Sequence, residues 1–522
     1  TAAGLALGIW LGHGLTAIVA ATVSELYYQV TADAVQISAS SLAKAIALGL
    51  GGTLVAAWLP ARQAARTPPL TTLSRAALED SARGRLPRLA LAGALLVMGG
   101  LAIAFLLPGG VVTGFAGLFL MIIGAALITP LGLRLTHRLF DLLPGRGIWR
   151  MAVRDLDRHL SRLGTAAAAL MVALSASVGV AVMVDSMRGS VSDWLRALLT
   201  ADLYVAAEGF ADGASLPAHV AETAKRLPAV DSYSSYRDRT LRLSGKRVEL
   251  VAATLAPASR AGFDFTARGI ADPWALFDRG QVLISEPLAH RLDLGAGGRL
   301  RLPTPAGDAE FTVAAVFRDF ASEHGRLFLD RRAYQRYWPD PAVDTLALFS
   351  AQGAAALARA AGAALPDAGL VLTAAREIHR ESMAVFDRTF RITEVLRLLS
   401  LLVAFIGVLT ALMAVQLERS KEYAVLRALG LTRQQVGTLI LLESGTLGLL
   451  AGVLAIPTGI AMAWVLTEAI QLRAFGWSMP FVVSAGPLWL TLGLGVLAAL
   501  LASLYPAWRS AWHDPAPQLR ED

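Results

Sequence analysis

The amino-acid sequence predicts an α-helical membrane protein, with about eight transmembrane helices in this chain and an α+β extracytoplasmic domain. Two features of the composition favour this class. Of the 522 residues, 55% are hydrophobic and only 17% are charged, against about 25% charged residues in a typical soluble protein. The third observation is a series of bilayer-length apolar segments, interrupted once by about 200 residues of mixed polarity.

The expected spans follow from segment length. A helix needs roughly 20 apolar residues to cross the hydrocarbon core, and the segments that satisfy this are approximately residues 2–21, 41–59, 88–107, 112–132, 163–185, 395–416, 437–466 and 486–505. The chain begins at Thr1, directly before the first of them. No basic n-region precedes this segment, as a signal peptide would require. We therefore expect that the sequence is truncated at its N-terminus.

Basic residues mark one side of the membrane. The net charge is +7, and Arg and Lys gather in residues 60–88, 133–162 and 418–436 and in the C-terminal tail. Alternation of the expected spans puts these segments on the same side, which the positive-inside rule assigns to the cytoplasm. The long polar stretch then faces outward. This distribution explains the basic composition without nucleic acid, which we do not expect as a partner.

The outward-facing stretch has the pattern of a layered domain. Segments 247–255, 280–286, 298–304, 309–317 and 369–374 are rich in β-formers or alternate in polarity, and they predict strands. Helices are expected at 286–297, ending at Gly295, and at 354–365. Strands and helices alternate, which indicates a compact α+β domain.

Two similarities within the chain indicate an internal repeat. GLALG (Gly4–Gly8) resembles GLLAG (Gly448–Gly452), and the segment LPARQAARTPPL from Leu59 resembles YPAWRSAWHDPAP from Tyr505 at nearly the same offset. Repeats in membrane transporters are usually pseudo-symmetric halves. The second copy follows an outer domain and a span. We expect the same before the first copy, upstream of Thr1.

Residues 418–436, ERSKEYAVLRALGLTRQQV, form a charged segment between two expected spans. Its first twelve residues contain neither Pro nor Gly, so their helix propensity is high. Gly430 suits the position just past a helix end. Thr432 with Gln435 matches a capping box that would start the next helix. The segment therefore predicts a short helix that stops before the following span begins.

The apolar side chains of this short helix leave two functions open. Tyr423, Leu426 and Leu429 are spaced three residues apart and form a partial stripe. An interfacial helix would lay this stripe on the membrane surface. A docking helix would instead present exposed leucines and the surrounding charges to a cytoplasmic partner.

Three features near the spans have structural interpretations. Residues 149–163 place Trp and Leu on one stripe and Arg on another, which suits a helix on the inner leaflet. Glu443 lies about two turns into a span, where a carboxylate is costly and indicates a functional or packing role. Gly448 and Gly452 permit close helix contact and predict packing rather than a binding site.

Motifs of catalysis and metal binding are absent from the sequence. It contains no P-loop, no His-Glu-x-x-His and no Gly-x-Ser-x-Gly. The eight histidines are scattered, and neither His290 nor His324 is expected to bind a metal. There is no cysteine, which excludes disulfides and thiol chemistry. We therefore expect a non-catalytic chain without a cofactor or metal of its own.

Residues 418–463 resemble the core of the FtsX/MacB-type permeases, the membrane subunits of a mechanotransmitting class of ABC systems. The family pattern is Glu-Arg-x-x-Glu-x-x-x-Leu-Arg-Ala-Leu-Gly, followed by a span that contains Glu. It is carried here by Glu418, Arg419, Glu422, Leu426, Arg427, Ala428, Leu429, Gly430 and Glu443. Residues 280–302, GQVLISEPLAHRLDLGAGGRLRL, also resemble the periplasmic core of that family, although less specifically.

The resemblance implies a domain order similar to that of the ten-span YbbP-like permeases. The expected parts are the end of a first FtsX-like half (1–87, two spans and a cytoplasmic exit), two linking spans (88–132), a basic amphipathic cytoplasmic or interfacial helix (133–162), the first span of the second half (163–187), a periplasmic MacB-like α+β domain (188–390), and a second FtsX-like domain (391–522) with a coupling helix at 418–430.

The resemblance also implies a function in the bacterial inner membrane. A separate ABC ATPase dimer, which would bind ATP and Mg, would serve one permease chain and drive a conformational change of the periplasmic domain. The substrates would be membrane lipids, lipoproteins or other hydrophobic compounds. The alternative is a transmembrane regulator that activates a periplasmic partner, such as an esterase or lysophospholipase, without transport. The residues implied in ATPase docking are Glu418, Arg419, Glu422, Tyr423, Leu426, Arg427, Leu429 and Gly430.

Overall fold

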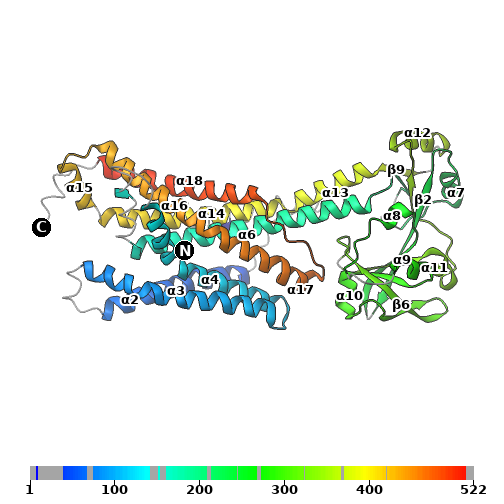
Figure 1. The fold of residues 1–522 in the computed structure, drawn as a ribbon, viewed down its shortest axis with the longest axis horizontal. Helices are drawn as coiled ribbons and strands as arrows, with labels where there is room; N and C mark the ends of the chain where they lie inside the picture. Colours follow the sequence, from blue (N-terminus) through cyan, green and yellow to red (C-terminus); the bar gives the residue numbers. More distant parts are fainter. Residues whose placement is uncertain are drawn as a thin grey trace. The chain divides into compact units, whose positions relative to one another are not determined.

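The chain folds as two compact units. The helical unit comprises Thr1–Val184, Asp387–Val465 and Val483–Asp522, and the sheet unit comprises Asp185–Phe386 and Leu466–Val482. Both are drawn in Figure 1. The computed structural model describes residues 8–9, 39–66, 75–141, 151–152, 160–208, 213–243, 245–266, 272–322, 324–365, 369–418 and 420–512.

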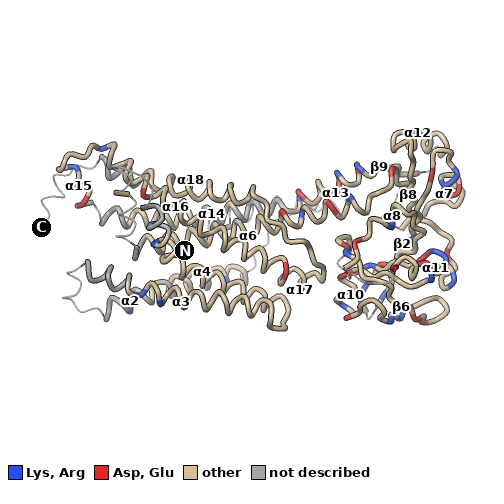
Figure 2. The backbone as a smooth tube through the Cα atoms, viewed as in Figure 1, with Lys and Arg blue, Asp and Glu red and all other residues tan. Residues whose placement is uncertain are grey.

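The helical unit is built from long helices and one short one. They are α2 (Ala39–Arg66), α3 (Arg75–Leu106), α4 (Gly110–Asp141), α6 (Leu160–Leu198), α14 (Arg391–Glu418), α15 (Ser420–Ala428), α16 (Arg433–Trp464) and α18 (Ala485–Trp512). Their middle portions carry few charged residues and are tan in Figure 2. The C-terminal part of α6 belongs to the sheet unit.

Five described helices are long and apolar enough to cross a membrane. Their bounds are Gly84–Leu106, Gly110–Leu135, Leu163–Leu198, Arg433–Phe475 and Ala485–Tyr505. They coincide with five of the expected spans. The helix expected at 437–466 is longer than predicted, because its hydrogen-bonded backbone continues to Phe475.

The other three expected spans are not established. Residues 2–21 lie outside the described residues except for 8–9. The spans expected at 41–59 and 395–416 fall within α2 and α14. The apolar stretches described there are Ala39–Leu54 and Leu401–Ala414, each of them part of a longer helix.

Several expected domain boundaries fall inside helices. Those at 87–88, 132–133 and 187–188 lie within α3, α4 and α6, because each helix extends beyond the apolar stretch that predicted the boundary. The boundary at 390–391 coincides with the turn between α13 (Ala375–Thr389) and α14. Of the basic segment 133–162, residues 142–150 and 153–159 lie outside the described part of the chain.

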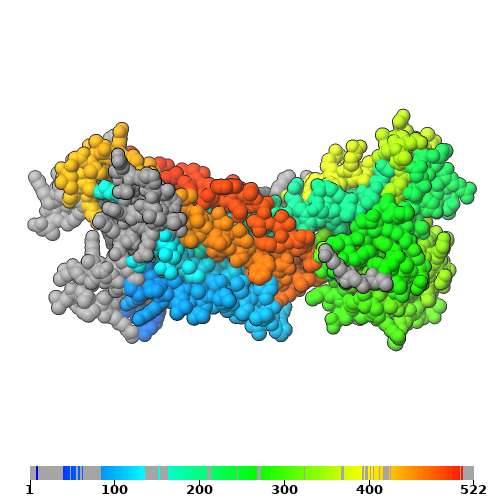
Figure 3. Space-filling model, in the orientation of Figure 1, coloured from blue at the N-terminus to red at the C-terminus, as the bar shows by residue number. Residues whose placement is uncertain are grey.

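Facing glycines bring α3 and α4 into contact. A Cβ atom on Gly100 would lie 2.5 Å from the carbonyl oxygen of Gly117, and one on Gly93 would lie 2.6 Å from that of Gly124. The two backbones therefore meet directly at two levels, as in small-residue packing of membrane helices. Their other faces form the blue surface in Figure 3 and expose apolar side chains that suit lipid contact, namely Leu91, Leu95, Met98, Phe119 and Ile123.

A buried apolar core joins helices that are distant in the sequence. It brings together α4, α6, α14, α16 and α18 through Leu133, Leu170, Met171, Leu174, Val408, Leu412, Leu447, Ala451 and Ala502. These side chains are almost fully buried. The core thus fixes α18 and α16, the helix that follows α15, against α6.

The described strands of the sheet unit form one mixed sheet. They are β1 (Leu203–Ala207), β2 (Ser232–Leu243), β3 (Lys246–Thr254), β4 (Val282–Ser285), β5 (Arg299–Thr304), β6 (Gly307–Phe317), β7 (Arg326–Asp330), β8 (Thr345–Phe349) and β9 (Leu370–Ala374). Their order is β5-β6-β4-β7-β3-β2-β8-β1-β9. β3 pairs with β7, and β4 with β6, in parallel, whereas the other described pairs are antiparallel.

The strands expected from the sequence are confirmed as β3, β4, β5, β6 and β9. β1, β2, β7 and β8 were not predicted. The helix expected at 354–365 is confirmed as α12 (Ala354–Ala364). The helix expected at 286–297 ends earlier, at Leu292 instead of Gly295, because Asp293 adopts the left-handed conformation with φ of 52° and stops it.

The remaining described helices are short. They are α7 (Ala218–Lys225), α8 (Pro257–Arg260), α9 (Pro273–Asp278), α10 (Glu286–Leu292), α11 (Arg331–Tyr337), α17 (Leu472–Phe475) and the π-helix η3 (Val465–Gln471). On one face α10 and α11 pack through Leu288 and Tyr334 onto Leu250 and Ile284. On the other face Phe277 of α9 joins an aromatic core. Residues on alternate sides of the strands thus supply two cores.

The segment Leu466–Val482 is part of the sheet unit. The backbone N–H of Ser478 donates to Oε2 of Glu286 at 2.9 Å. The rings of Trp477 and Phe320 meet edge to face, with centroids 4.7 Å apart. Because η3 and α17 continue α16 without a break, this segment links the sheet unit to the helix that follows α15.

Candidate functional site

The end of α15 has the geometry that its sequence predicts. Gly430 takes a φ of 106°, which lies in the region that favours glycine. Its N–H donates to the carbonyl of Arg427 at 3.1 Å, and the N–H of Leu431 donates to the carbonyl of Leu426 at 3.1 Å. This pair of bonds is the Schellman motif. The predicted helix stop is therefore confirmed.

The start of α16 is confirmed as a capping box. The side chain of Thr432 accepts a hydrogen bond from the N–H of Gln435 at 3.2 Å, and the side chain of Gln435 accepts one from the N–H of Thr432 at 2.8 Å. Both bonds satisfy backbone groups that a helix end leaves free. Only the short link Leu429–Thr432 separates α15 from α16, which keeps the two helices closely coupled.

The inner face of α15 is anchored by Tyr423. This side chain is only 2% exposed and packs with Val436, Leu439 and Ile440 of α16. Leu426 packs against the same cluster and is partly buried. The expectation that both leucines of the stripe are exposed is therefore wrong for Leu426, because it lies on the same side of the helix as Tyr423.

The outer face of α15 exposes a different apolar pair. Leu429 is 77% exposed and Val425 is 47% exposed. Val425 was missed from the sequence, because it lies outside the three-residue spacing of the stripe. Glu422 and Gly430 are also exposed, and Arg427 is half-buried. The α15 surface, defined here as Glu422, Val425 and Leu429, thus combines apolar and acidic groups.

Two of the predicted docking residues lie wholly or partly outside the described residues. Arg419 lies outside the described residues, and Glu418 ends α14 with a side chain that is not described. Figure 2 shows charged positions of both signs on and near α15. The described part of the site therefore begins at Glu422.

The intramembrane residues lie on α16. Glu443 is 8% exposed. A Cβ atom on Gly448 would lie 2.7 Å from the carbonyl oxygen of Gly495 in α18, and one on Gly452 would lie 2.9 Å from Cδ1 of Leu492. Both glycines therefore face α18 and allow close packing of the two helices.

An ion cluster that sequence reasoning missed fastens the sheet unit. Asp340 accepts hydrogen bonds from Nε of Arg237 at 2.9 Å and from Nη2 of Arg239 at 2.7 Å. Nη1 of Arg237 also donates to Asp344 at 2.6 Å. Burial alone would raise the pKa of Asp340, but the hydrogen bonds from Arg239 and Arg237 outweigh it and hold the pKa well below its usual value.

This cluster has a structural role in the sheet unit. It joins β2 to the segment between α11 and β8, over a sequence separation of 103 residues between Arg237 and Asp340. Such a pairing has no local sequence signal. Within the described ranges, no group of three or more His, Cys, Asp or Glu side chains is arranged to hold a metal ion.

Family models match two parts of the chain. Residues 163–365 match the MacB-like periplasmic core domain, and residues 395–515 match the FtsX-like permease C-terminal domain. The first match contains most of the sheet unit, and the second contains α15, α16 and α18. Both candidate regions described above thus lie in recognised domains.

Curated relatives are ABC transporter components. The uncharacterized ABC transporter permease protein Rv0987 of Mycobacterium tuberculosis is 36% identical over 541 aligned residues, covering 100% of this chain and 63% of the relative. The lipoprotein-releasing system transmembrane protein LolC of Haemophilus influenzae is 28% identical over 123 residues, 23% of this chain and 31% of the relative. The chain spans less than two thirds of the length of either protein.

Two further proteins are similar over smaller regions. The macrolide export ATP-binding/permease protein MacB of Bdellovibrio bacteriovorus is 30% identical over 122 residues, 23% of this chain and 18% of the relative. Among solved structures, the extracellular domain of the noncanonic ABC-type transporter YknZ from Gram-positive bacteria is 12% identical, covers 33% of this chain and 98% of that domain, and gives a TM-score of 0.25. With its MacB-like periplasmic core domain, its FtsX-like C-terminal domain and its membrane-length helices, the chain belongs to the FtsX/MacB-type ABC transporter permeases of the inner membrane.

Proposed function

We propose that this permease couples ATP hydrolysis by a separate ATPase dimer to movement of its periplasmic domain. The observation that carries the proposal is the two-faced packing of α15. Tyr423 and Leu426 fasten the helix to α16, while Leu429 and Val425 remain exposed. An anchored helix with an exposed apolar outer face suits a docking element that receives force from a partner.

The route of the movement starts at the α15–α16 junction. The hydrogen bonds of the Schellman motif and the capping box restrict the backbone of the link between the two helices. A displacement of α15 is therefore passed to the N-terminal end of α16. The packing of Gly448 and Gly452 against α18 makes these two helices respond together.

The same route reaches the sheet unit through the chain itself. The helix that begins at Arg433 continues through η3 and α17 to Phe475. The residues that follow bind the sheet unit through Ser478, Trp477 and their partners Glu286 and Phe320. π-helical segments such as η3 are frequent at functional sites. Movement of α16 would thus act on α10 and its neighbours.

The cargo we propose is hydrophobic or amphiphilic, such as a lipid or a lipoprotein taken from the outer leaflet. Two relatives are named for lipoprotein release and macrolide export, and both names describe molecules with large apolar parts. ATP and Mg would be bound by the ATPase. A periplasmic enzyme such as an esterase or lysophospholipase is a further partner that we propose for the sheet unit.

The proposal is tested by reconstitution of the full chain with its partner ATPase in lipid vesicles. We expect the permease to stimulate ATP hydrolysis and to release a labelled lipid or lipoprotein to an acceptor in an ATP-dependent manner. Stimulated hydrolysis without release of either cargo would favour the regulatory alternative. If the ATPase neither bound the permease nor changed its turnover, the coupling function would be rejected.

A further inference from the structure

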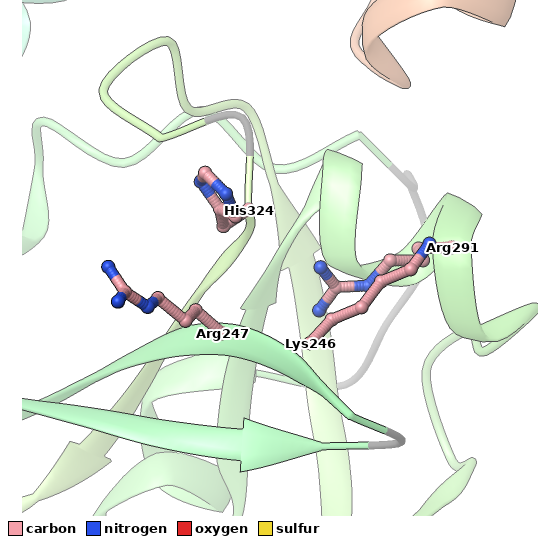
Figure 4. A pocket seen from close by; sticks show the side chains of 4 residues that line it. All are labelled: Lys246, Arg247, Arg291 and His324. Carbon is pink, nitrogen blue, oxygen red and sulfur yellow. The ribbon is translucent and has the colours of Figure 1, made fainter.

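A basic pocket of about 500 Å³ lies in the sheet unit. The described residues that line it are Lys246, Arg247, Arg291 and His324, and Figure 4 shows their side chains around it. Lys246 and Arg247 begin β3, Arg291 lies on α10, and His324 lies in the loop before β7. All four side chains are basic, although they come from three separate elements.

The fold brings these elements together through Gly325. Its φ of 85° favours glycine, and a Cβ atom there would lie 2.7 Å from Cβ of Leu288 in α10. Its carbonyl accepts a hydrogen bond from the N–H of Glu249 in β3 at 3.1 Å. The loop that carries His324 is thereby held against both elements that carry the other basic residues.

The turn between β2 and β3 fixes the remaining side of the pocket. Leu243 and Lys246 are paired across the hairpin, and so are Arg242 and Arg247. Gly245 in the turn takes a φ of 78°. Lys246 and Arg247 therefore start β3 at a defined register, next to the loop held by Gly325.

The positive charge of the pocket is not compensated by described residues. No described carboxylate forms an ion pair with any of the four lining side chains, whereas nearby Arg326 pairs with Glu249 at 2.8 Å. Nη2 of Arg291 is buried and has no hydrogen-bond partner among the described residues. Burial lowers the pKa of this guanidinium group. A buried donor of this kind is costly unless a ligand satisfies it.

We propose that this pocket binds a phosphate group, with the Arg291 guanidinium as the main donor and Lys246, Arg247 and His324 around it. The planar donor fork of arginine matches the oxygens of phosphate. A phosphate monoester carries about 1.5 to 2 negative charges at neutral pH, which suits a site with several cations better than a single carboxylate. The phosphate is either a free anion or part of a phospholipid headgroup.

The test is a binding titration with the purified full chain in a non-ionic detergent. The probes are inorganic phosphate, a short-chain phosphatidic acid, and a phosphatidylcholine with the same acyl chains. The variants are Arg291→Gln and Arg247→Gln. Arg336→Gln is the matched control, because Arg336 is exposed on α11 of the same unit and does not line the pocket.

We expect inorganic phosphate to bind the wild-type chain and Arg291→Gln to weaken binding about tenfold, as loss of one charge-assisted hydrogen bond implies. Arg247→Gln should weaken it less, and Arg336→Gln should change it by less than about twofold. Phosphatidic acid that binds more tightly than phosphate, with the same dependence on Arg291, identifies a lipid headgroup. Equal binding of both probes identifies free phosphate.

Two results would overturn the assignment. One is the absence of phosphate binding to the wild-type chain. The other is an equal loss of affinity in Arg291→Gln and Arg336→Gln, which would show attraction by net charge alone. Melting temperatures of all variants report whether they are folded. The titration contains no ATPase, so its outcome is independent of the coupling function proposed above.

Discussion

Replacing Leu429 by Asp is expected to weaken ATPase binding while the permease stays folded. Leu429 is 77% exposed at the end of α15, and its backbone belongs to the turn that ends at Gly430. Full burial of a leucine side chain is worth about 1.5–3 kcal/mol. Because most of this side chain is still exposed, its burial by a partner would contribute roughly 1–2 kcal/mol to the binding free energy. A carboxylate would in addition resist desolvation at an apolar contact.

The expected effect is a loss of at least about tenfold in affinity, because 1.4 kcal/mol corresponds to a factor of ten. The assay is co-purification of the full chain with its partner ATPase, followed by a binding titration in detergent. Val371→Asp is the matched control. Val371 is 46% exposed in β9 of the sheet unit, outside the surface that we propose for ATPase docking.

The choice of Leu429 over Leu426 depends on the structure. Leu426 packs on the cluster around Tyr423, so Leu426→Asp would disturb the fold and the docking surface together. The reasoning is refuted if Leu429→Asp binds the ATPase within about twofold of the wild type. It also fails if Val371→Asp weakens binding to the same extent.

Three other predictions concern stability. Gly448→Ala is expected to lower the melting temperature of the full chain, because its methyl group would overlap the backbone of Gly495. Gly437→Ala is the control: it adds a methyl group in open space and should not lower the melting temperature. Gly430→Ala places a side chain at a φ of 106° and should destabilise the folded turn by about 1–2 kcal/mol. The expected result is faster limited proteolysis at the end of α15. Unchanged cleavage would contradict the turn assignment. The sheet unit should lose stability as the pH falls below about 4, because Asp340 has a lowered pKa in the folded state and the unfolded chain takes up the proton first. Thermal unfolding of the full chain at several pH values, followed by its β-sheet circular dichroism, measures this loss of stability. Asp340→Asn should flatten the pH dependence. An equally steep curve in that variant would show that the ion pairs of Asp340 do not cause it.

Local features of the site could be predicted from the sequence. The stop at Gly430 and the cap formed by Thr432 and Gln435 depend on residues within a few positions of one another. Their conformational preferences are intrinsic to the residue types. The long apolar helices were predictable for a similar reason, since membrane spans are continuous segments of one polarity.

Features that depend on distant residues could not be predicted. Burial of Tyr423 follows from its contact with α16 and with Ala152 and Ala507, which no spacing rule indicates. The short strands β7 and β8 consist of five residues each, too few to distinguish a buried strand from a helical turn. β2 was missed because charged residues such as Arg237 and Asp238 interrupt its apolar pattern.

The basic pocket also could not be predicted, because its residues are distant from one another in the sequence. Lys246, Arg291 and His324 are ordinary surface residue types when each is considered alone. Only the turn at Gly325 and the packing of α10 place them around one cavity. Net charge along the sequence indicated membrane topology, but it did not indicate this local concentration of charge.

The central claim, that α15 transmits the ATPase cycle to the sheet unit, is tested most directly by a distance measurement. Because the chain contains no cysteine, spin labels can be attached uniquely to Leu497→Cys in α18 and Arg336→Cys in α11, both exposed positions in different units. We predict that ATP shifts the distance distribution of the ATPase-bound permease, and that Leu429→Asp abolishes the shift. An unchanged distribution with ATP, while the ATPase stays bound and active, would contradict it.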